Sequence, residues 1–176
     1  MRTLALLAAF FYSSPVAAYD FIEFSDPFPL DFVQGGAAVA GAGNRIYWLD
    51  ERKGLLHVLS ADGRPLASAG SGKLSYPEGV AIAPSGDVYV ADTGNSRIVV
   101  YDRDGKELRV IGERGSDPGS LSKPRSVAVG FDGRFVWYAT STSTVRRYNA
   151  ETMVGSDLTL SPPLTGPVTD FLYDGQ

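Results

Sequence analysis

The sequence predicts an all-β protein, and three observations lead to this expectation. Glycine supplies 20 and proline 11 of the 176 residues, a content that favours many turns and short elements. Short runs rich in β-branched and aromatic residues recur between those turns. After the first 18 residues, no stretch keeps a helical spacing of hydrophobic residues over ten positions. We therefore expect short antiparallel strands and no helix in this part of the chain.

Composition and charge exclude several classes of function. The chain has no cysteine, which excludes disulfides, thiol nucleophiles and thiolate metal sites. Its net charge is −4 and it has no basic block, so we expect no nucleic-acid partner. His57 is the one histidine, and a histidine-based metal centre could be built only around it.

The first 18 residues have the pattern of a secretory signal peptide. Arg2 gives a positive start, and residues 4–12 form an apolar run. That run is too short for a membrane span, which needs about 20 residues. Val16 and Ala18 stand at the small-residue positions of a cleavage site, so the mature chain should begin at Tyr19. We expect a secreted or periplasmic protein whose mature chain has no membrane span; a buried amphipathic helix is the alternative.

Residues 19–34 form a leader segment rich in phenylalanine, with Phe21, Phe24, Phe28 and Phe32. Exposed aromatic patches are uncommon on soluble monomers. We therefore interpret the segment as a leader strand, packed on the first repeat or completing the last one of a full ring. An exposed arm that grips a ligand is the alternative.

Residues 77–112 contain four predicted strands separated by turns. The strands are expected near 79–83, 87–91, 97–101 and 106–111. Ser85–Gly86, residues 93–95 and residues 102–105 have turn composition, and Gly105 is free to take a positive φ. We therefore expect this unit to form a four-stranded antiparallel sheet.

The same unit recurs along the chain. Residues 36–40 and 126–129 match the first strand, 46–50 and 136–139 the second, and 56–59 and 145–148 the third. The predicted repeat units are 35–73, 74–120, 121–161 and a partial 162–176. Four antiparallel strands per ~40–45 residues are typical of a β-propeller blade. A β-sandwich with evenly spaced strands is the alternative, but it would not require the turns to fall at matching positions in each unit. We expect a β-propeller of four-stranded antiparallel blades with about three and a half blades, a partial ring.

The second unit resembles the NHL repeat. The resemblance is carried by PEGVA at 77–81, SGDVYVADTGNSRIVVYD at 85–102, DGK at 104–106 and IGERGSDPGSLSKP at 111–124. It extends over roughly residues 35–175, but only 74–120 carries the full motif. The resemblance implies that Asp92, Asn95 and Arg97 tie strands and neighbouring blades together.

Departures from the motif in the other units speak against a repeated catalytic set. The first unit keeps Asp50 but has Leu55 in place of Arg97. The third unit has Thr140 and Thr144 at the positions of Asp92 and Arg97. NHL propellers usually have about six blades, and a ring needs at least about four. The resemblance therefore implies the front part of a longer protein; closure by oligomerisation or a degenerate arc are the alternatives.

Metal-binding propeller enzymes place their ligands at the start of each innermost strand. The matching positions here are Gly35, Glu78, Arg125 and Gly166, a single carboxylate beside a cation. A divalent ion needs several oxygen or imidazole ligands. His57 falls on an outer strand, where a packed histidine is the simpler interpretation. We therefore expect no metal and no cofactor.

These arguments predict a non-catalytic, extracytoplasmic binding or scaffold module whose partner is a protein, a peptide or a glycan. Loops held on rigid strands are a usual place for recognition. The candidate contacts are the channel-mouth and connector residues Tyr76, Glu78, Arg114, Asp117, Lys123 and Arg125. The alternative is the N-terminal fragment of a propeller hydrolase or lyase, of lactonase or amidating-lyase type, with a channel metal.

Overall fold

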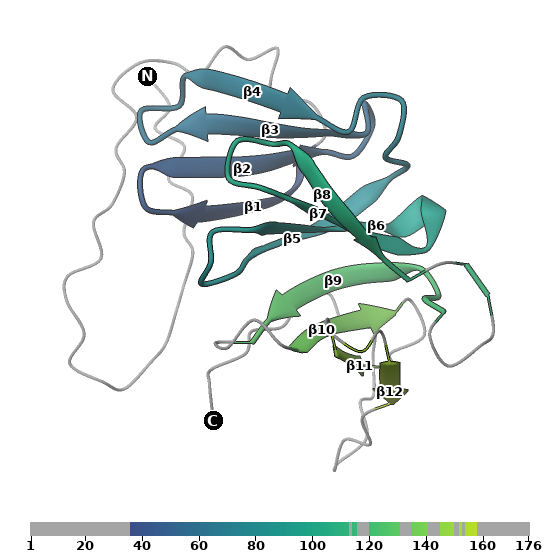
Figure 1. Ribbon diagram of the computed structural model, residues 1–176. Helices are drawn as coiled ribbons and strands as arrows, with labels where there is room; N and C mark the ends of the chain where they lie inside the picture. Colours follow the sequence, from purple (N-terminus) through teal and green to yellow (C-terminus); the bar gives the residue numbers. More distant parts are fainter. Residues whose placement is uncertain are drawn as a thin grey trace, which may run out of the picture.

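The computed structural model describes residues 36–112, 114–115, 120–130, 135–140, 145–149, 152 and 154–157. Within these residues the fold is all-β, with three four-stranded antiparallel sheets that follow one another along the chain (Figure 1). The predicted signal peptide at 1–18, the leader at 19–34 and the partial unit at 162–176 lie outside the described residues.

Each sheet is formed by four consecutive strands, paired in chain order. We call the three sheets blades 1, 2 and 3. Blade 1 contains β1 (Gly36–Ala42), β2 (Arg45–Asp50), β3 (Leu55–Ser60) and β4 (Pro65–Ala69). Blade 2 contains β5 (Pro77–Ile82), β6 (Val88–Asp92), β7 (Arg97–Tyr101) and β8 (Glu107–Ile111). Blade 3 contains β9 (Pro124–Val129), β10 (Phe135–Thr140), β11 (Val145–Asn149) and β12 (Val154–Asp157).

The strand register confirms the alignment of the repeats. In blade 2, Asp92 pairs with Arg97 on β7 and with Pro77 on β5. Asp50 occupies the same position in blade 1, where it pairs with Leu55. Thr140 of blade 3 pairs with Pro124, as Asp92 does with Pro77. Leu55 and Thr140 therefore occupy sites structurally equivalent to Arg97 and Asp92, while Thr144 lies outside the described residues.

Strand bounds differ slightly from the prediction. The innermost strand β5 begins at Pro77, two residues early, because Pro77 pairs with Asp92 across a bulge before Gly79. A proline is tolerated at the first position of a strand, where no ladder hydrogen bond from its nitrogen is needed. The turn after β6 is a short 3₁₀ turn, η2 (Thr93–Asn95), closed by Ser96 in the left-handed region at φ 55°.

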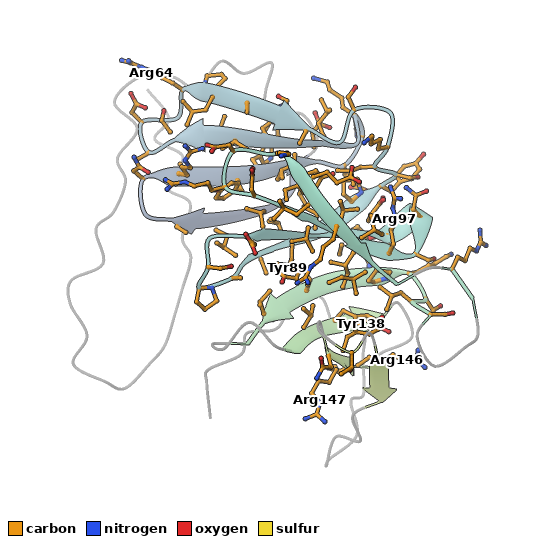
Figure 2. All side chains as sticks on the ribbon, viewed as in Figure 1. Arg64, Tyr89, Arg97, Tyr138, Arg146 and Arg147 are labelled. Atoms are coloured by element: carbon orange, nitrogen blue, oxygen red, sulfur yellow. The ribbon has the colours of Figure 1, made fainter. Side chains whose placement is uncertain are left out.

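Blades pack face to face through two hydrophobic clusters. Residues alternate between the two faces of each strand, so blade 2 contributes one set of side chains to each neighbour. Val88, Val90, Val99 and Tyr101 pack on blade 1, where Leu49 is among the partners. The opposite face is packed on blade 3, with these buried residues in one cluster: Tyr89, Ala91, Ile98, Val100, Ile111, Val127, Val136, Tyr138 and Tyr148. Figure 2 places Tyr89 and Tyr138 on the two sides of this interface.

The innermost strands of successive blades approach closely. β5 contacts both β1 and β9. A Cβ atom at Gly79 would lie 2.6 Å from the backbone oxygen of Arg125, a distance that real Cβ atoms do not show. A side chain at this position would therefore push β5 away from β9, and glycine is what allows the strands of adjacent blades to converge.

His57 is a packed residue of β3, in line with its interpretation from the sequence. It is 6% exposed, and its ring stacks on Trp48 with the ring centroids 4.9 Å apart. Its Nδ1 atom lies 3.1 Å from the Ser68 hydroxyl. Burial lowers the pKa of His57 below its usual value; the charge of Asp50 opposes this shift and that of Lys53 adds to it.

Candidate binding face

The candidate residues gather at one end of the blades. β5 and β9 begin at this end, and η2 joins β6 to β7 there. The described parts of the connectors that enter blades 2 and 3 also lie there, since they lead into Pro77 and Pro124. We call this end, formed by the described residues of 73–78, 93–97, 112–115 and 120–125, the connector face.

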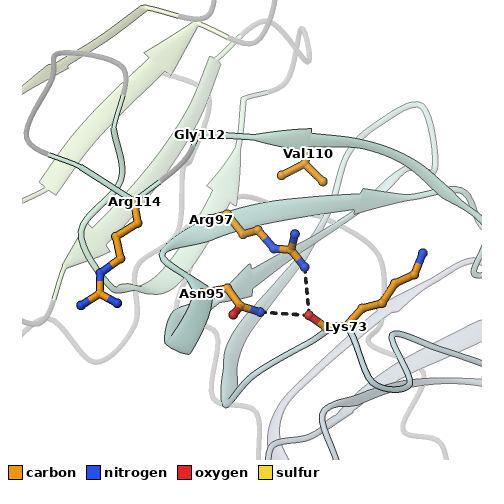
Figure 3. A pocket seen from close by; sticks show the side chains of 6 residues that line it. All are labelled: Lys73, Asn95, Arg97, Val110, Gly112 and Arg114. Atoms are coloured by element: carbon orange, nitrogen blue, oxygen red, sulfur yellow. Dashed lines mark hydrogen bonds between the residues drawn. The ribbon is translucent and has the colours of Figure 1, made fainter.

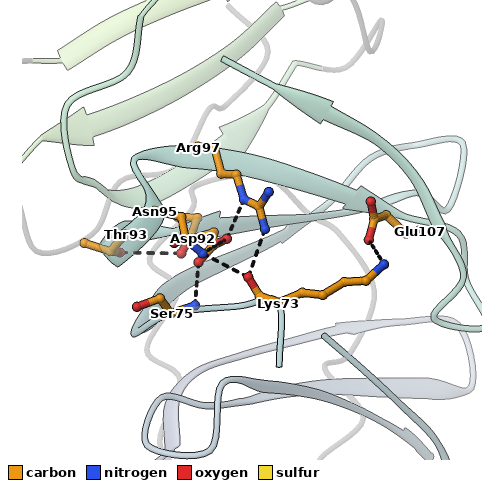
Figure 4. Close-up of polar contacts among 8 residues, drawn as sticks. Lys73, Ser75, Asp92, Thr93, Asn95, Arg97 and Glu107 are labelled. Carbon is orange, nitrogen blue, oxygen red and sulfur yellow. Dashed lines mark hydrogen bonds and ion pairs between the residues drawn. The ribbon is translucent and has the colours of Figure 1, made fainter. Parts of the chain in front are cut away.

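A buried carboxylate organises the centre of the connector face. Asp92 is fully buried and accepts three hydrogen bonds (Figure 4). Its Oδ1 receives the backbone N–H of Ser75 at 2.7 Å. Its Oδ2 receives the Asn95 side-chain amide at 2.8 Å and the Arg97 Nε at 2.7 Å. Ionised acceptors bound in this way make the stronger class of hydrogen bond.

The same network holds both connectors. The Asn95 amide and the Arg97 Nη2 each donate to the backbone oxygen of Lys73, both at 2.9 Å. Thr93 donates its hydroxyl to the backbone oxygen of Pro124 at 2.7 Å. The β6–β7 turn is thus bonded to the chain entering blade 2 and to the chain entering blade 3. This geometry ties strands and blades together, and it leaves Asp92 engaged rather than available for chemistry.

Blade 1 keeps the aspartate but satisfies it differently. Asp50 is 1% exposed, and its Oδ1 accepts the backbone N–H of Lys53 at 2.9 Å. The Lys53 ammonium lies 3.7 Å from the other carboxylate oxygen. Lys53 thus supplies the positive charge that Arg97 supplies in blade 2, so no cation is needed at position 55. Lys53 was not singled out from the sequence, although it stands three residues after Asp50, as Asn95 does after Asp92.

Two candidate residues form an ion pair between blades. Glu78 on β5 accepts a hydrogen bond from Arg125 Nε on β9 at 2.5 Å. The Glu78 side chain is 24% exposed and that of Arg125 43%. The charge of Glu78 is therefore already balanced by a cation from the neighbouring blade.

Tyr76 and Lys123 precede Pro77 and Pro124 at equivalent places in the two connectors. Both have left-handed backbones, with φ of 46° and 44°. A residue before proline ordinarily prefers an extended conformation, and a non-glycine residue with positive φ is uncommon. Both side chains are exposed, Tyr76 at 64%. An aromatic ring and a cation are thus exposed at equivalent positions of two connectors.

A recess lies farther out on the connector face, beside the ends of β7 and β8 (Figure 3). It has a volume of about 490 Å³. Three of the lining residues are cationic and none is acidic; the lining comprises Lys73, Asn95, Arg97, Val110, Gly112 and Arg114. Arg114 was a candidate from the sequence, whereas Lys73, Val110 and Gly112 were not, because nothing local links them to Arg97.

The other predicted site positions lie outside the described residues: Gly35, Asp117 and Gly166. In the part of the chain that the structure describes, no three histidine, aspartate or glutamate side chains are grouped as a metal site. Likewise, none of the described segments is a helix of the length and apolarity needed to cross a membrane.

Sequence comparisons identify the repeat. The NHL repeat family matches residues 74–101, within the second unit. RING finger protein nhl-1 of Caenorhabditis elegans is 36% identical over 73 residues, which are 39% of this chain and 8% of that protein. Protein brain tumor of Drosophila melanogaster is 40% identical over 58 residues, which are 33% of this chain and 6% of that protein. The aligned part spans less than a tenth of either relative.

Structural comparisons confirm the fold. Hydrazine synthase of Kuenenia stuttgartiensis matches with a TM-score of 0.62 and 13% identity, over 92% of this chain and 42% of that one. Virginiamycin B lyase of Staphylococcus aureus matches with a TM-score of 0.59 and 18% identity, over 76% and 44%. The WD40 domain of Neurospora crassa Pan2 matches with a TM-score of 0.54 and 12% identity, over 70% and 35%. At these identities the likeness shows the propeller fold alone.

Proposed function

We propose that this chain, which carries an NHL repeat among propeller blades, is a non-catalytic binding module that acts outside the cytoplasm and holds a protein or peptide on its connector face. NHL repeats generally mediate protein interactions. The proposal rests mainly on Tyr76 and Lys123, two exposed residues with a left-handed backbone at equivalent positions of two connectors.

Preorganisation supports a recognition role for these residues. A non-glycine residue in the left-handed region costs free energy, which persists only where surrounding structure imposes it. Here the hydrogen bonds of Asp92 and Thr93 hold the connectors on both sides of η2. A tyrosine on a backbone held in this way can bury a large amphipathic surface on a partner without a cost for ordering that backbone.

The engagement of Glu78 argues against the alternative of a hydrolase or lyase with a channel metal. A carboxylate that serves a divalent ion must be free to coordinate it, and a nearby guanidinium repels the ion. Glu78 instead accepts a hydrogen bond from Arg125. Metal analysis of the full-length gene product after dialysis should give well under one equivalent. One retained equivalent, lost together with activity in Glu78→Gln, would favour the enzyme instead.

The binding test compares two exposed hydrophobic side chains. The wild-type chain, immobilised and exposed to the secreted or periplasmic fraction of its native host, should retain a partner that Tyr76→Ala fails to retain. Leu108→Ala is the matched control, because Leu108 is 49% exposed but lies on the outer strand β8. Equal retention by wild type and Tyr76→Ala would refute the connector face as the binding surface.

Export is tested separately by the mass of the mature protein. We expect an amino terminus at Tyr19 in material from the native host. An intact Met1 in a cytosolic pool would contradict the extracytoplasmic role, and the binding test would then use the cytosolic fraction as its source of partners.

A further inference from the structure

We propose that the recess lined by Arg97 and Arg114 binds carboxylate side chains, so that the partner of this module presents an acidic peptide segment. The inference rests on the proposed function and names the chemistry of the partner at a second part of the connector face.

Some cations of the connector face have no ion-pair partner and can bind an anion. Lys73 lines the recess, but its ammonium contacts the Glu107 carboxylate at 3.0 Å. Arg97 is balanced by Asp92. Among the described residues, neither Arg114 nor Lys123 has an ion pair, and both are exposed. The described part of the recess therefore carries an excess positive charge, whereas the whole chain has a net charge of −4.

Arg97 is held in an orientation suited to an anion. Its Nε donates to Asp92 and its Nη2 to the Lys73 backbone oxygen, which fixes the guanidinium plane. A guanidinium has five N–H donors, so donors remain after these two bonds. A planar fork that is already oriented loses little entropy on binding a carboxylate. Arg97 can therefore donate hydrogen bonds to a bound carboxylate while its bonds to Asp92 and Lys73 stay in place.

The recess suits amino-acid side chains in size and polarity. Its volume of about 490 Å³ lies within the usual range of small-ligand sites, roughly 300–1,000 Å³. Val110 gives one apolar wall for the methylene groups of a glutamate or aspartate, and Gly112 leaves its part of the wall without a side chain. Figure 3 shows Arg114 on the other side of the opening from Lys73.

A carboxylate fits these observations better than a nucleic-acid backbone. Binding to nucleic acid draws its affinity from many phosphate contacts along a basic surface. On the described part of the connector face only Arg114 and Lys123 are cations without an ion pair, and the acidic chain as a whole repels a long polyanion. One or two carboxylates in a recess need only local positive charge.

The test uses a fluorescein-labelled octaglutamate peptide and the full chain, followed by fluorescence anisotropy at low salt. Arg114→Ala should weaken binding at least fivefold, and Arg114→Lys should restore part of the loss. Arg64→Ala is the matched control, because Arg64 is an exposed arginine remote from the recess in Figure 2. Arg114 joins the structure through a backbone bridge to Leu121, so truncating its side chain leaves that bridge intact.

Several outcomes would overturn the inference. These are binding of octaglutamine as tight as that of octaglutamate, equal weakening by Arg64→Ala and Arg114→Ala, or tighter binding of a single-stranded oligonucleotide than of the peptide. If the native partner is retained through Tyr76 and the peptide does not bind, the recess assignment fails while the binding module stands. If neither binds, both proposals fail.

Discussion

Arg97→Ala is expected to destabilise the protein by about 2–3 kcal/mol. The substitution removes two hydrogen bonds, Nε to Asp92 at 2.7 Å and Nη2 to the Lys73 backbone oxygen at 2.9 Å. A hydrogen bond to a charged group contributes about 1.5–3 kcal/mol and a neutral one about 1. Removing one partner of a buried ion pair costs about 3–5 kcal/mol in full.

Two features place the expected cost below that full value. Asp92 keeps the N–H groups of Ser75 and Asn95, so its carboxylate is not left without donors. The Arg97 side chain is 29% exposed, so water can reach the vacated position. The remaining cost comes from a fully buried carboxylate that has lost its counter-charge, and from a connector that has lost one of its two side-chain donors.

The assay is urea unfolding of the full chain, followed by circular dichroism. With a slope of about 2 kcal/mol per molar urea, the midpoint should fall by about 1–1.5 M. Arg97→Lys should recover part of this loss, since it keeps the charge but not the fork. Arg64→Ala is the control, because the Arg64 side chain is 83% exposed and its midpoint should not move. An unchanged midpoint for Arg97→Ala would refute the structural role of the network.

Two further predictions concern the approach of β5 to β9 and the buried histidine of blade 1. Gly79→Ala should destabilise by about 1–3 kcal/mol, because its Cβ would meet the Arg125 backbone; Gly41→Ala, whose Cβ would lie 3.8 Å from its nearest neighbour, should be nearly neutral in the same urea assay. Equal effects of the two would contradict the close approach of β5 and β9. Burial lowers the pKa of His57, so the folded state binds its proton less readily than the unfolded state, whose pKa is about 6.5. His57 therefore contributes stability above that pH, and the contribution is lost as pH falls through 6.5 towards the folded pKa. Between pH 7.5 and 5.5, the His57→Leu variant should therefore lose less stability than the wild type. In the wild type, an NMR titration of the single imidazole should have its midpoint below pH 6.5, and a midpoint above that value would contradict the prediction.

The blades could be predicted from the sequence because their signals are local. The run of β-branched and aromatic residues at 97–101 and the turn composition of 102–105 specify a strand and its turn without reference to other blades. The comparison of units then placed Asp50 and Thr140 at the position of Asp92, which the register confirms. The start of β5 was predicted two residues late, because the bulge after Pro77 depends on pairing with Asp92.

Only the tertiary structure decided what the candidate residues do. The Glu78–Arg125 pair joins residues 47 positions apart, and the two Lys73 contacts join chain segments more than 20 positions apart. The exposure of Tyr76 and the outline of the recess likewise follow from how the connectors cross the blade ends. The repeating sequence determined each blade, because a strand and its turn are stabilised by near neighbours. The connector face arises where different blades meet, and its charges and shape are set by contacts that no local pattern encodes.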